Sequence, residues 1–275
     1  MQKIISFLQD RSVDGLLSYA DQAEAAKCFD RSLSEIEELA LTNKILPARY
    51  QRNQNSISTQ QQLTLFSSTV AVIGCGGLGG YIIEELARLG IGRLIVVDPD
   101  IFEEHNLNRQ ILCTLDQLAD KKVAGAVQRV TEINPAVQVH PVAKEFNSRN
   151  GMEILNGVTV AADALDTIPA RMQLAETCEK LDIPLVHGAI AGWYGTVANQ
   201  FPGDRTLQQM YGGEEAEKGI ETRLGNPSFT PALIASIEVA EIVKILLGTG
   251  VPLRNSYLHI DLYHLEVNEI PMNKG

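Results

Sequence analysis

The feature that most constrains the fold is a β-branched run followed at once by a glycine-rich turn, over Val70–Gly80. The run itself has the composition of a buried strand. Gly74, Gly76 and Gly79 follow it with the spacing G-x-G-x-x-G, which lets a backbone turn tightly and approach a phosphate closely. We therefore expect a strand–turn–helix unit whose turn faces an anion at the start of the helix.

The residues after the turn complete a βαβ unit. Apolar residues recur at helical spacing from Ile82 to Leu89, and a second strand, Arg93–Val97, ends on Asp98. An acidic residue at the end of that strand suits the hydroxyl groups of a ribose. The fingerprint does not separate the nucleotides, because NAD, FAD and ATP can all occupy such a turn. A turn without any ligand is disfavoured, since the strand, the helix and Asp98 all stand in the expected places.

Composition narrows the class of protein. The chain has 275 residues, which is enough for one large α/β domain and a small appendage. Its formal net charge of −11 argues against a nucleic-acid-binding surface. The N-terminal apolar stretch breaks off too early for a signal peptide, and no apolar run approaches the length of a membrane span. The four cysteines form no C-x-x-C pair, which fits a reduced, cytoplasmic protein.

Residues 1–47 predict a helical appendage, and residues 48–275 predict the domain that contains the glycine-rich turn. Ser32 and Glu35 fit a capping box for one helix of the appendage, and Pro47 ends the helical pattern. Residues 51–62 are polar and are expected to link the two parts. We expect the appendage to serve packing or dimerisation.

The rest of the chain alternates strands and helices and then has strands in succession. Strands are expected at 137–142, 158–165, 184–189, 196–201 and 257–262, and helices at 121–132, 169–181 and 231–247. This order predicts an α/β fold with a Rossmann-like, mostly parallel sheet that is extended by antiparallel strands. The glycine-rich stretch 202–228 is expected to be a long functional or mobile loop.

Polar residues cluster where the expected strands end, which is where ligands bind in open α/β sheets. The cluster consists of Asp98, Asn106, Arg109, Gln110, Lys122, Asp166 and Arg171. Cations, an amide and a free carboxylate around a phosphate cradle suit a triphosphate with Mg²⁺. They suit a nicotinamide ring poorly, because attack on an α-phosphate needs neutralised pyrophosphate charge and hydride transfer does not.

Seven short motifs follow one another along the chain. They are Arg49-Tyr-Gln-Arg52, Gly74-Cys-Gly-Gly-Leu-Gly79, Asn106-Leu-Asn-Arg-Gln110, Lys122-Val-Ala with Ile133-Asn-Pro135, Leu165-Asp-Thr-Ile-Pro-Ala-Arg171, Pro184-Leu-Val-His-Gly-Ala189 and Ala240-Glu-Ile-Val-Lys244. In sequence and in order they resemble motifs of the ThiF/MoeB/HesA family, the bacterial relatives of ubiquitin-activating enzymes. The third, which matches N-L-x-R-Q, is the most specific. The resemblance runs from Arg49 to about Leu262.

The resemblance implies an enzyme that uses Mg-ATP to adenylate the C-terminal glycine carboxylate of a small ubiquitin-like sulfur carrier of the MoaD or ThiS kind. Pyrophosphate would be released, and the product would serve sulfur transfer in the biosynthesis of molybdopterin, thiamin or another cofactor. The resemblance also implies a homodimer and a separate sulfur donor, such as a cysteine desulfurase. No protein nucleophile is needed, because the carrier's carboxylate is itself the attacking group.

The same resemblance implies roles for individual residues. Four glycines would approach the nucleotide: Gly74, Gly76, Gly77 and Gly79. Asp98 would hold the ribose. One amide and two cations would contact or neutralise the phosphates: Asn106, Arg109 and Lys122. Asp166 would bind Mg²⁺, and Arg52 would reach the γ-phosphate. In relatives this arginine comes from the other subunit of a dimer.

The chain departs from the family in two respects. Many relatives carry two C-x-x-C pairs for structural zinc, but no cysteine stands at 206–211 or at 271–275. We therefore expect no zinc. Some relatives also have a loop cysteine that can link covalently to the carrier, and near that position this chain has Glu221 and Thr222. This puts a thioester mechanism in doubt.

Other interpretations stay open from the sequence alone. Relatives with the same chemistry can adenylate another carboxylate, for example on a modified tRNA base, although the acidic balance disfavours it. A nicotinamide-dependent oxidoreductase is supported only by the glycine fingerprint, and a non-catalytic dimeric adaptor would keep ATP as a structural ligand. Arg171 suits a structural ion pair as well as a site role. His187 is expected to form hydrogen bonds or pack, and Glu238 and Glu241 are expected to face solvent or a dimer partner.

Overall fold

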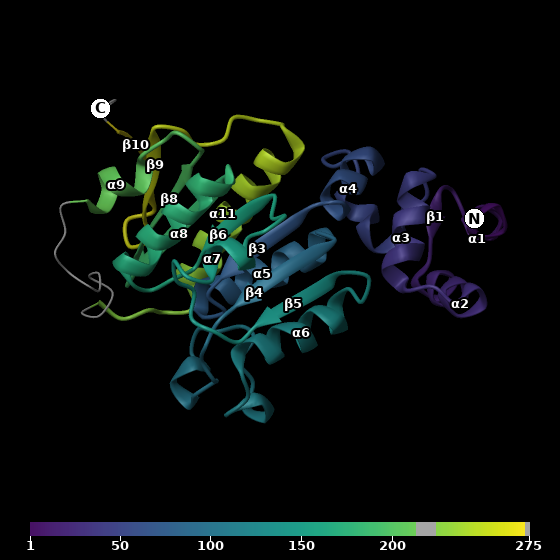
Figure 1. The fold of residues 1–275 in the computed structure, drawn as a ribbon, viewed down its shortest axis with the longest axis horizontal. Coiled ribbons are helices and arrows are strands. Elements are labelled where there is room, and N and C mark those ends of the chain that lie inside the picture. Colours follow the sequence, from purple (N-terminus) through teal and green to yellow (C-terminus); the bar gives the residue numbers. More distant parts are fainter. Residues whose placement is uncertain (213–223, 273–275) are drawn as a thin grey trace.

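The computed structural model describes residues 1–212 and 224–272, which form a helical segment joined to a layered α/β unit (Figure 1). Its eight-stranded sheet has the order β10-β9-β8-β7-β6-β3-β4-β5. The strands are β3 Thr69–Ile73, β4 Arg93–Val97, β5 Gln138–Val142, β6 Val160–Asp163, β7 Leu185–Ala191, β8 Tyr194–Gln200, β9 Ser256–Asp261 and β10 Glu266–Pro271. Neighbours from β7 to β5 are parallel, and β8, β9 and β10 are antiparallel. The predicted fold class is confirmed.

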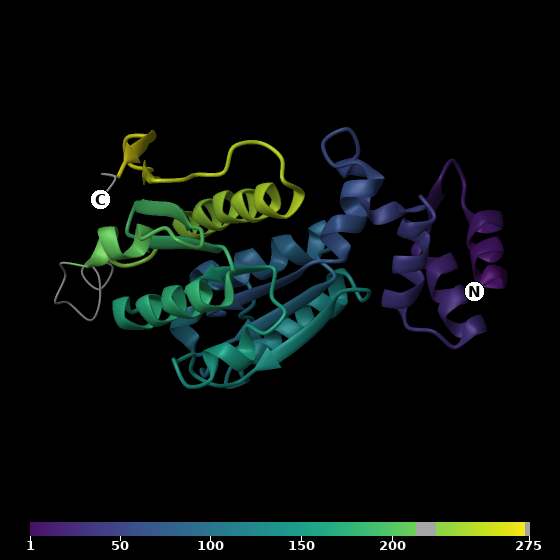
Figure 2. The ribbon, with the colours of Figure 1, turned by 45° about the horizontal axis from the view of Figure 1, so that its top comes forward.

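Helices cover both faces of the sheet, as its apolar parallel strands require. One face carries α5 (Gly77–Leu89), α6 (Lys122–Ile133) and α11 (Phe229–Leu247), which share the larger core with the strands. The opposite face carries α7 (Gly151–Ile154), α8 (Ile168–Leu181) and α9 (Thr206–Tyr211) around a second core (Figure 2). Within the described residues, no helix combines the length and apolarity that a membrane crossing needs.

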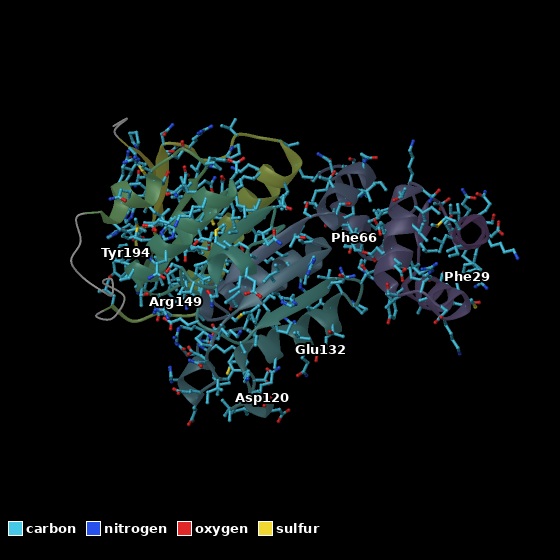
Figure 3. The ribbon with its side chains drawn as sticks, viewed as in Figure 1. Phe29, Phe66, Asp120, Glu132, Arg149 and Tyr194 are labelled. Atoms are coloured by element: carbon cyan, nitrogen blue, oxygen red, sulfur yellow. The ribbon has the colours of Figure 1, made fainter. Side chains whose placement is uncertain are left out.

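The predicted N-terminal helices are present: α1 (Gln2–Arg11), α2 (Tyr19–Phe29) and α3 (Leu33–Thr42). Ser32 and Glu35 form the predicted capping box of α3. The three helices enclose a small core of their own, in which Phe29 packs edge-on against Phe7 at 5.5 Å between ring centroids (Figure 3). The short strands β1 (Leu16–Leu17) and β2 (Leu46–Pro47) pair beside them. The division of the chain at residue 47 stays a prediction.

A buried polar network joins these helices to the sheet unit. Glu37 of α3 is fully buried and forms an ion pair with Arg49 at 3.0 Å, and it accepts a 2.6 Å hydrogen bond from the Tyr50 hydroxyl. Arg49 and Tyr50 lie in the 3₁₀ helix η1 (Ala48–Asn53). Asn134 Nδ2, at the end of α6, donates to the Tyr50 hydroxyl at 2.7 Å and to the Ala87 carbonyl at 3.0 Å. A buried carboxylate needs such partners, so this network fixes η1 in place.

Residues 51–62, which are expected to link the two parts of the chain, contain the end of η1 and the start of helix α4 (Thr59–Phe66). Ser58 and Gln61 form a capping box at its start. Gln62 is buried and donates through Nε2 to the Leu89 carbonyl at 2.7 Å. Phe66 lies at the junction with the N-terminal helices (Figure 3). The helix is not evident from the sequence because its first half is polar and its apolar side chains occur only in its second half.

Three smaller differences concern the end of one strand and the presence of two short elements. Strand β6 ends at Asp163 rather than at residue 165, and the expected loop 202–228 contains α9. Strand β10 was not predicted; it is an edge strand in which most residues are exposed and half are polar, so it lacks the apolar alternation of a half-buried strand. Residues 213–223, including Glu221 and Thr222, lie outside the described residues.

The expectation for Glu238 and Glu241 is wrong, because α11 is covered on the side that carries them and both are buried. Glu241 accepts from Asn199 Nδ2 at 2.6 Å and from the Leu253 N–H at 2.9 Å. Glu238 packs against Gly188, where a side chain would collide with it, and its carboxyl oxygens have no hydrogen-bond partner in the part of the chain that the structure describes. Burial, and then the nearby Asp163 carboxylate, raise the pKa of Glu238 well above its ordinary value.

Replacing Glu238 with glutamine is expected to stabilise the protein more at pH 8 than at pH 5. The folded pKa is raised, so the folded protein keeps a proton that the unfolded chain loses above about pH 4.5. Stability therefore falls with rising pH, by up to about 1.4 kcal/mol per pH unit, and Glu238→Gln removes that slope. Urea unfolding at both pH values measures it. Glu241→Gln, which loses satisfied bonds, is the control and should destabilise. A pH-independent difference for Glu238→Gln would contradict the assignment.

Candidate functional site

A pocket of about 450 Å³ opens at the ends of β3, β4 and β6, beside the second half of β7. Eight predicted site residues line it: Gly74, Gly76, Gly77, Asp98, Asn106, Arg109, Lys122 and Asp166. Gly79 and Arg52 are not among the described residues that line it. The strand-end cluster of the sequence analysis is thus assembled around one cavity.

Two glycines of the glycine-rich turn, Gly74 and Gly79, pack too closely for a side chain. Gly74 has φ +105°, and a Cβ there would lie 2.5 Å from the Ala164 carbonyl oxygen. A Cβ on Gly79 would collide with the Gly74 carbonyl, so Gly79 closes the turn without facing the pocket. Gly76 and Gly77 line the pocket where α5 begins, and Gly76 gives this helix no side-chain cap. The amide groups of the first turn are therefore available to an anion.

Asp98 ties the second strand to this turn. One carboxylate oxygen accepts from the Cys75 N–H at 2.7 Å, and the other accepts from the Asp100 N–H at 2.9 Å. The residue is nearly buried but faces the pocket. Because each carboxylate oxygen can accept more than one hydrogen bond, Asp98 retains capacity for a diol.

Arg109 and Asn106 come from the loop after β4. Asn106 is buried and caps η2 (Glu104–Asn106) by accepting from the Glu103 N–H at 3.0 Å. Arg109 Nη1 donates to the His105 carbonyl at 3.2 Å and to Asn108 Oδ1 at 2.9 Å. No carboxylate within residues 1–212 and 224–272 pairs with the Arg109 guanidinium. Its charge is therefore available to a ligand in the pocket.

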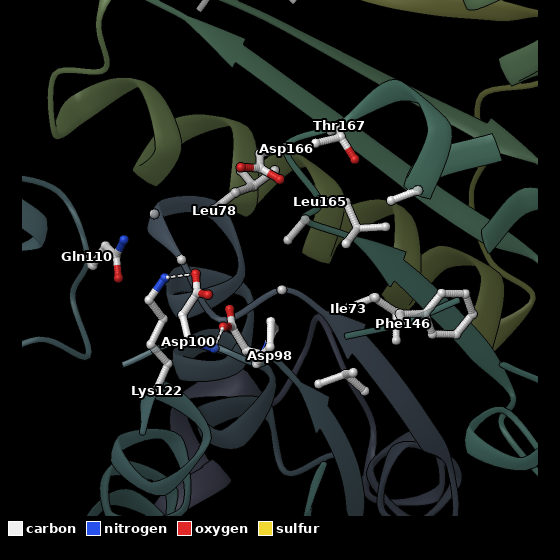
Figure 4. Close-up of a pocket in the computed structure, with 18 of the residues that line it drawn as sticks. Ile73, Leu78, Asp98, Asp100, Gln110, Lys122, Phe146, Leu165, Asp166 and Thr167 are labelled. Atoms are coloured by element: carbon white, nitrogen blue, oxygen red, sulfur yellow. Dashed lines mark hydrogen bonds and ion pairs between the residues drawn. The ribbon is translucent and has the colours of Figure 1, made fainter. Parts of the chain in front are cut away.

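Lys122 opens α6 with its ammonium in the pocket wall. Its Nζ lies 2.9 Å from Asp100 Oδ2, as the dashed line in Figure 4 shows. The Lys122 side chain is only 9% exposed, whereas that of Asp100 is 63% exposed. An incoming phosphate could replace the exposed carboxylate beside a cation that is held in place.

Replacing Asp100 with asparagine is expected to strengthen ATP binding about two- to fivefold, the range for losing one exposed ion pair that competes with the ligand. Titration calorimetry of ATP with the purified protein measures the affinity. Glu103→Gln, a nearby exposed carboxylate without a contact to Lys122, is the matched control and should leave affinity unchanged. Weaker binding by Asp100→Asn would show instead that Asp100 orients Lys122 for the phosphates.

Asp166 lies beyond the end of β6, across the pocket from Lys122 (Figure 4). It is exposed, and its carboxylate has no hydrogen-bond or ion-pair partner among the residues that the structure describes. No group of three or more His, Cys, Asp or Glu side chains suited to a metal ion occurs in that part of the chain. Mg²⁺ commonly uses one or two carboxylates together with phosphate oxygens and water. Asp166 therefore fits a magnesium ion shared with a bound triphosphate.

Arg52 is not brought to the pocket of its own chain. It is exposed on η1, whose Tyr50 packs against Gly90 at the carboxyl end of α5. The glycine turn lies at the other end of this 13-residue helix. At 1.5 Å per residue the helix separates the two by about 20 Å. A role for Arg52 at a nucleotide requires a second chain.

Two buried amide oxygens in the pocket wall belong to residues that were given no individual role: Gln110 of the strand-end cluster and Asn226. Gln110 Oε1 and Asn226 Oδ1 have no hydrogen-bond partner among the described residues. Buried polar atoms are usually paired, so these two acceptors suit donors on a ligand. Gln110 stands in the third motif, but Asn226 precedes α11 outside every motif, and no sequence signal marks it.

The sequence analysis also missed Asp163, which carries the buried carboxylate at the end of β6. His187 contacts it at 2.7 Å, which confirms the hydrogen-bonding role expected for His187. Arg171 both lines the pocket and donates to the Leu165 carbonyl, so it has a structural contact and a place in the site. Asp163 precedes the recognisable Asp166 by three residues, and only its burial distinguishes the two.

Comparisons with known proteins agree with this geometry. The model of the ThiF family matches residues 50–275. The SAMP-activating enzyme E1 of Haloferax volcanii is 33% identical over 228 residues, which cover 81% of this chain and 84% of that protein. The sulfur carrier protein adenylyltransferase of Thermus thermophilus is 30% identical over 238 residues, covering 82% and 88%. The solved structure of E. coli MccB with ATP has a TM-score of 0.70 at 20% identity, covers 92% of this chain and 79% of that one, and shows the same fold.

Proposed function

The chain belongs to the ThiF family and is an adenylyltransferase of the ubiquitin-activating class, and from this premise we propose its substrates. It uses ATP to adenylate the C-terminal glycine carboxylate of a small ubiquitin-like sulfur-carrier protein and releases pyrophosphate. The named relatives, which act on SAMP or on a sulfur carrier, support this substrate class.

The observation that carries the proposal is the distribution of charge in the pocket. A glycine turn offers backbone amides, Arg109 has no carboxylate partner in the described structure, and Lys122 has an exposed, replaceable one. Asp166 offers a carboxylate on the opposite wall that has no partner among the described residues. Cationic groups and a metal-binding carboxylate around a phosphate cradle are what attack on an α-phosphate needs.

In the proposed reaction the carrier's carboxylate oxygen forms a bond to the α-phosphorus. The bond from that phosphorus to the bridging oxygen breaks, and pyrophosphate leaves with the electron pair. Asp98 holds the ribose, and Asn106, Arg109 and Lys122 hold and neutralise the phosphates. A magnesium ion held by Asp166 would supply further charge neutralisation. Because no residue attacks the substrate, catalysis consists of positioning and electrostatic stabilisation.

Partner proteins belong to the same proposal. A sulfur donor such as a cysteine desulfurase would act on the adenylated carrier. A homodimer would bring Arg52 of one chain to the γ-phosphate in the other, which the separation of Arg52 from its own pocket supports. The acidic net charge of −11 disfavours a tRNA substrate.

The purified protein is expected to catalyse ATP–pyrophosphate exchange only when a cognate carrier is present. Labelled pyrophosphate, ATP, Mg²⁺ and candidate carriers that end in Gly-Gly are incubated with it, and label entering ATP is counted. A carrier whose terminal glycine has been removed is the control, because it lacks the attacking carboxylate at the required position. No exchange with any cognate carrier, together with tight NAD binding, would refute the proposal.

A further inference from the structure

A hydrogen-bonded chain beneath the pocket joins four elements. Asp163 ends β6, His187 lies in β7, Tyr211 ends α9, and Arg171 lies in the first turn of α8. Asp163 and His187 are fully buried. Asp163, His187 and Tyr211 are not among the described residues that line the pocket, so they touch a ligand there only through other residues.

The hydrogen bonds of this chain have one consistent direction. Burial lowers the pKa of His187, so its ring is neutral and one nitrogen donates while the other accepts. Nδ1 donates to Asp163 Oδ2 at 2.7 Å, and Nε2 accepts from the Tyr211 hydroxyl at 2.8 Å. Arg171 Nη1 in turn donates to the Tyr211 oxygen at 3.1 Å. Every donor in the series meets an acceptor.

Both ends of this hydrogen-bonded series meet the backbone of one residue, Leu165. Asp163 Oδ1 accepts from the Leu165 N–H at 2.9 Å. Arg171 donates to the Leu165 carbonyl through Nε at 3.1 Å and Nη2 at 2.7 Å. The backbone of Leu165 is therefore held on both sides, and the next residue is Asp166. The Asp166 carboxylate makes no hydrogen bond within the described residues, so its position depends on the backbone that precedes it.

We propose that Asp163, His187 and Tyr211 are positioning residues that, through Arg171 and Leu165, hold Asp166 toward the metal–nucleotide complex. The inference rests on the metal role given to Asp166 in the proposed function. It adds three residues to the site, none of which is among the described residues that line the pocket and none of which a motif assigns to catalysis. Tyr211 is the residue that links α9 to the site.

The test is Tyr211→Phe, which removes the hydroxyl shared by His187 and Arg171 and keeps the ring. The ATP dissociation constant is measured by calorimetry with and without Mg²⁺, in the absence of any carrier. We expect the gain in affinity that Mg²⁺ provides to shrink about three- to tenfold, the range for losing one hydrogen bond. Tyr257→Phe is the matched control, since Tyr257 borders the same surface groove as Tyr211 and has no hydrogen bond to Asp163, His187 or Arg171. It should retain the full gain.

A double-mutant cycle separates positioning from a general structural role. In an Asp166→Asn background, Tyr211→Phe is expected to have no further effect on ATP affinity, because both changes act through the same carboxylate. Additive losses, or a magnesium effect that Tyr211→Phe leaves intact, would overturn the inference, and so would the absence of any magnesium effect in the unsubstituted protein. Because no carrier is present, these outcomes are independent of whether carrier-dependent exchange succeeds.

Discussion

Replacing Asp166 with asparagine is expected to lower carrier-dependent ATP–pyrophosphate exchange about 10²–10³-fold, the usual cost of removing one preorganised electrostatic group. The substitution keeps the size of the side chain and removes its charge. Asp166 is exposed and has no partner in the described structure, so the thermal unfolding temperature should not change. Initial exchange rates over a range of Mg²⁺ concentrations, with calorimetric unfolding of the same samples, measure both effects.

The matched control is Asp116→Asn, an exposed aspartate outside the pocket, which should exchange at the unsubstituted rate. Near-native exchange by Asp166→Asn at saturating Mg²⁺ would refute a metal role for this carboxylate. A loss of exchange accompanied by a large fall in the unfolding temperature would point to damage of the fold. The two measurements together therefore decide between chemistry and stability.

Mixing two inactive variants, Arg52→Ala and Lys122→Ala, is expected to restore activity. In a mixed dimer, one site would combine a native Lys122 with a native Arg52 from the partner chain, and the other site would lack both. Random subunit exchange then gives roughly a quarter of the unsubstituted activity, because half the dimers are mixed and each has one complete site. The arginine would stabilise γ-phosphate charge from across the interface, as arginine fingers do. Exchange assays after mixing measure the recovery.

A second mixture provides the control. It combines Lys122→Ala with Asp166→Asn, two residues that line the pocket of their own chain. Each site of a mixed dimer then carries one of the two substitutions, so activity should stay absent. Persistent inactivity of the Arg52 and Lys122 mixture, with subunit exchange shown independently by differential labelling, would overturn the cross-subunit role. The adenylation chemistry would be unaffected by that outcome.

The sheet could be predicted because its parallel strands are short, apolar and followed by turns. The elements that could not be predicted lack the apolar pattern that is typical of their type of secondary structure. Helix α4 starts in a glutamine-rich run, and β10 is an exposed edge strand without apolar alternation. Glu238 was placed at the surface because its charge suggests exposure, whereas α11 is covered by the sheet and α5 on that side.

The part of the site that could be predicted comes from segments that are continuous in sequence, such as the glycine turn and the loop that carries Arg109. Pairings between distant segments could not be predicted. Lys122 meets Asp100 because an isolated bridge pairs Ile101 with Lys121, and His187 meets Asp163 because β6 pairs with β7. Asn226 lies in no motif, and its orientation toward the pocket depends on where α11 begins.

The network of Glu37, Arg49, Tyr50 and Asn134 bears on how sequence similarity in this family should be interpreted. Two of the seven recognisable motifs supply Arg49, Tyr50 and Asn134, and these residues lie at the end of α5 that is remote from the pocket. Their side chains bond one another across 84 positions of sequence. A substitution of Arg49, Tyr50 or Asn134 would therefore change how the N-terminal helices pack against the sheet unit, without removing a residue of the pocket. Some of the motifs by which such chains are recognised therefore stabilise the packing of the molecule and do not contact its substrates.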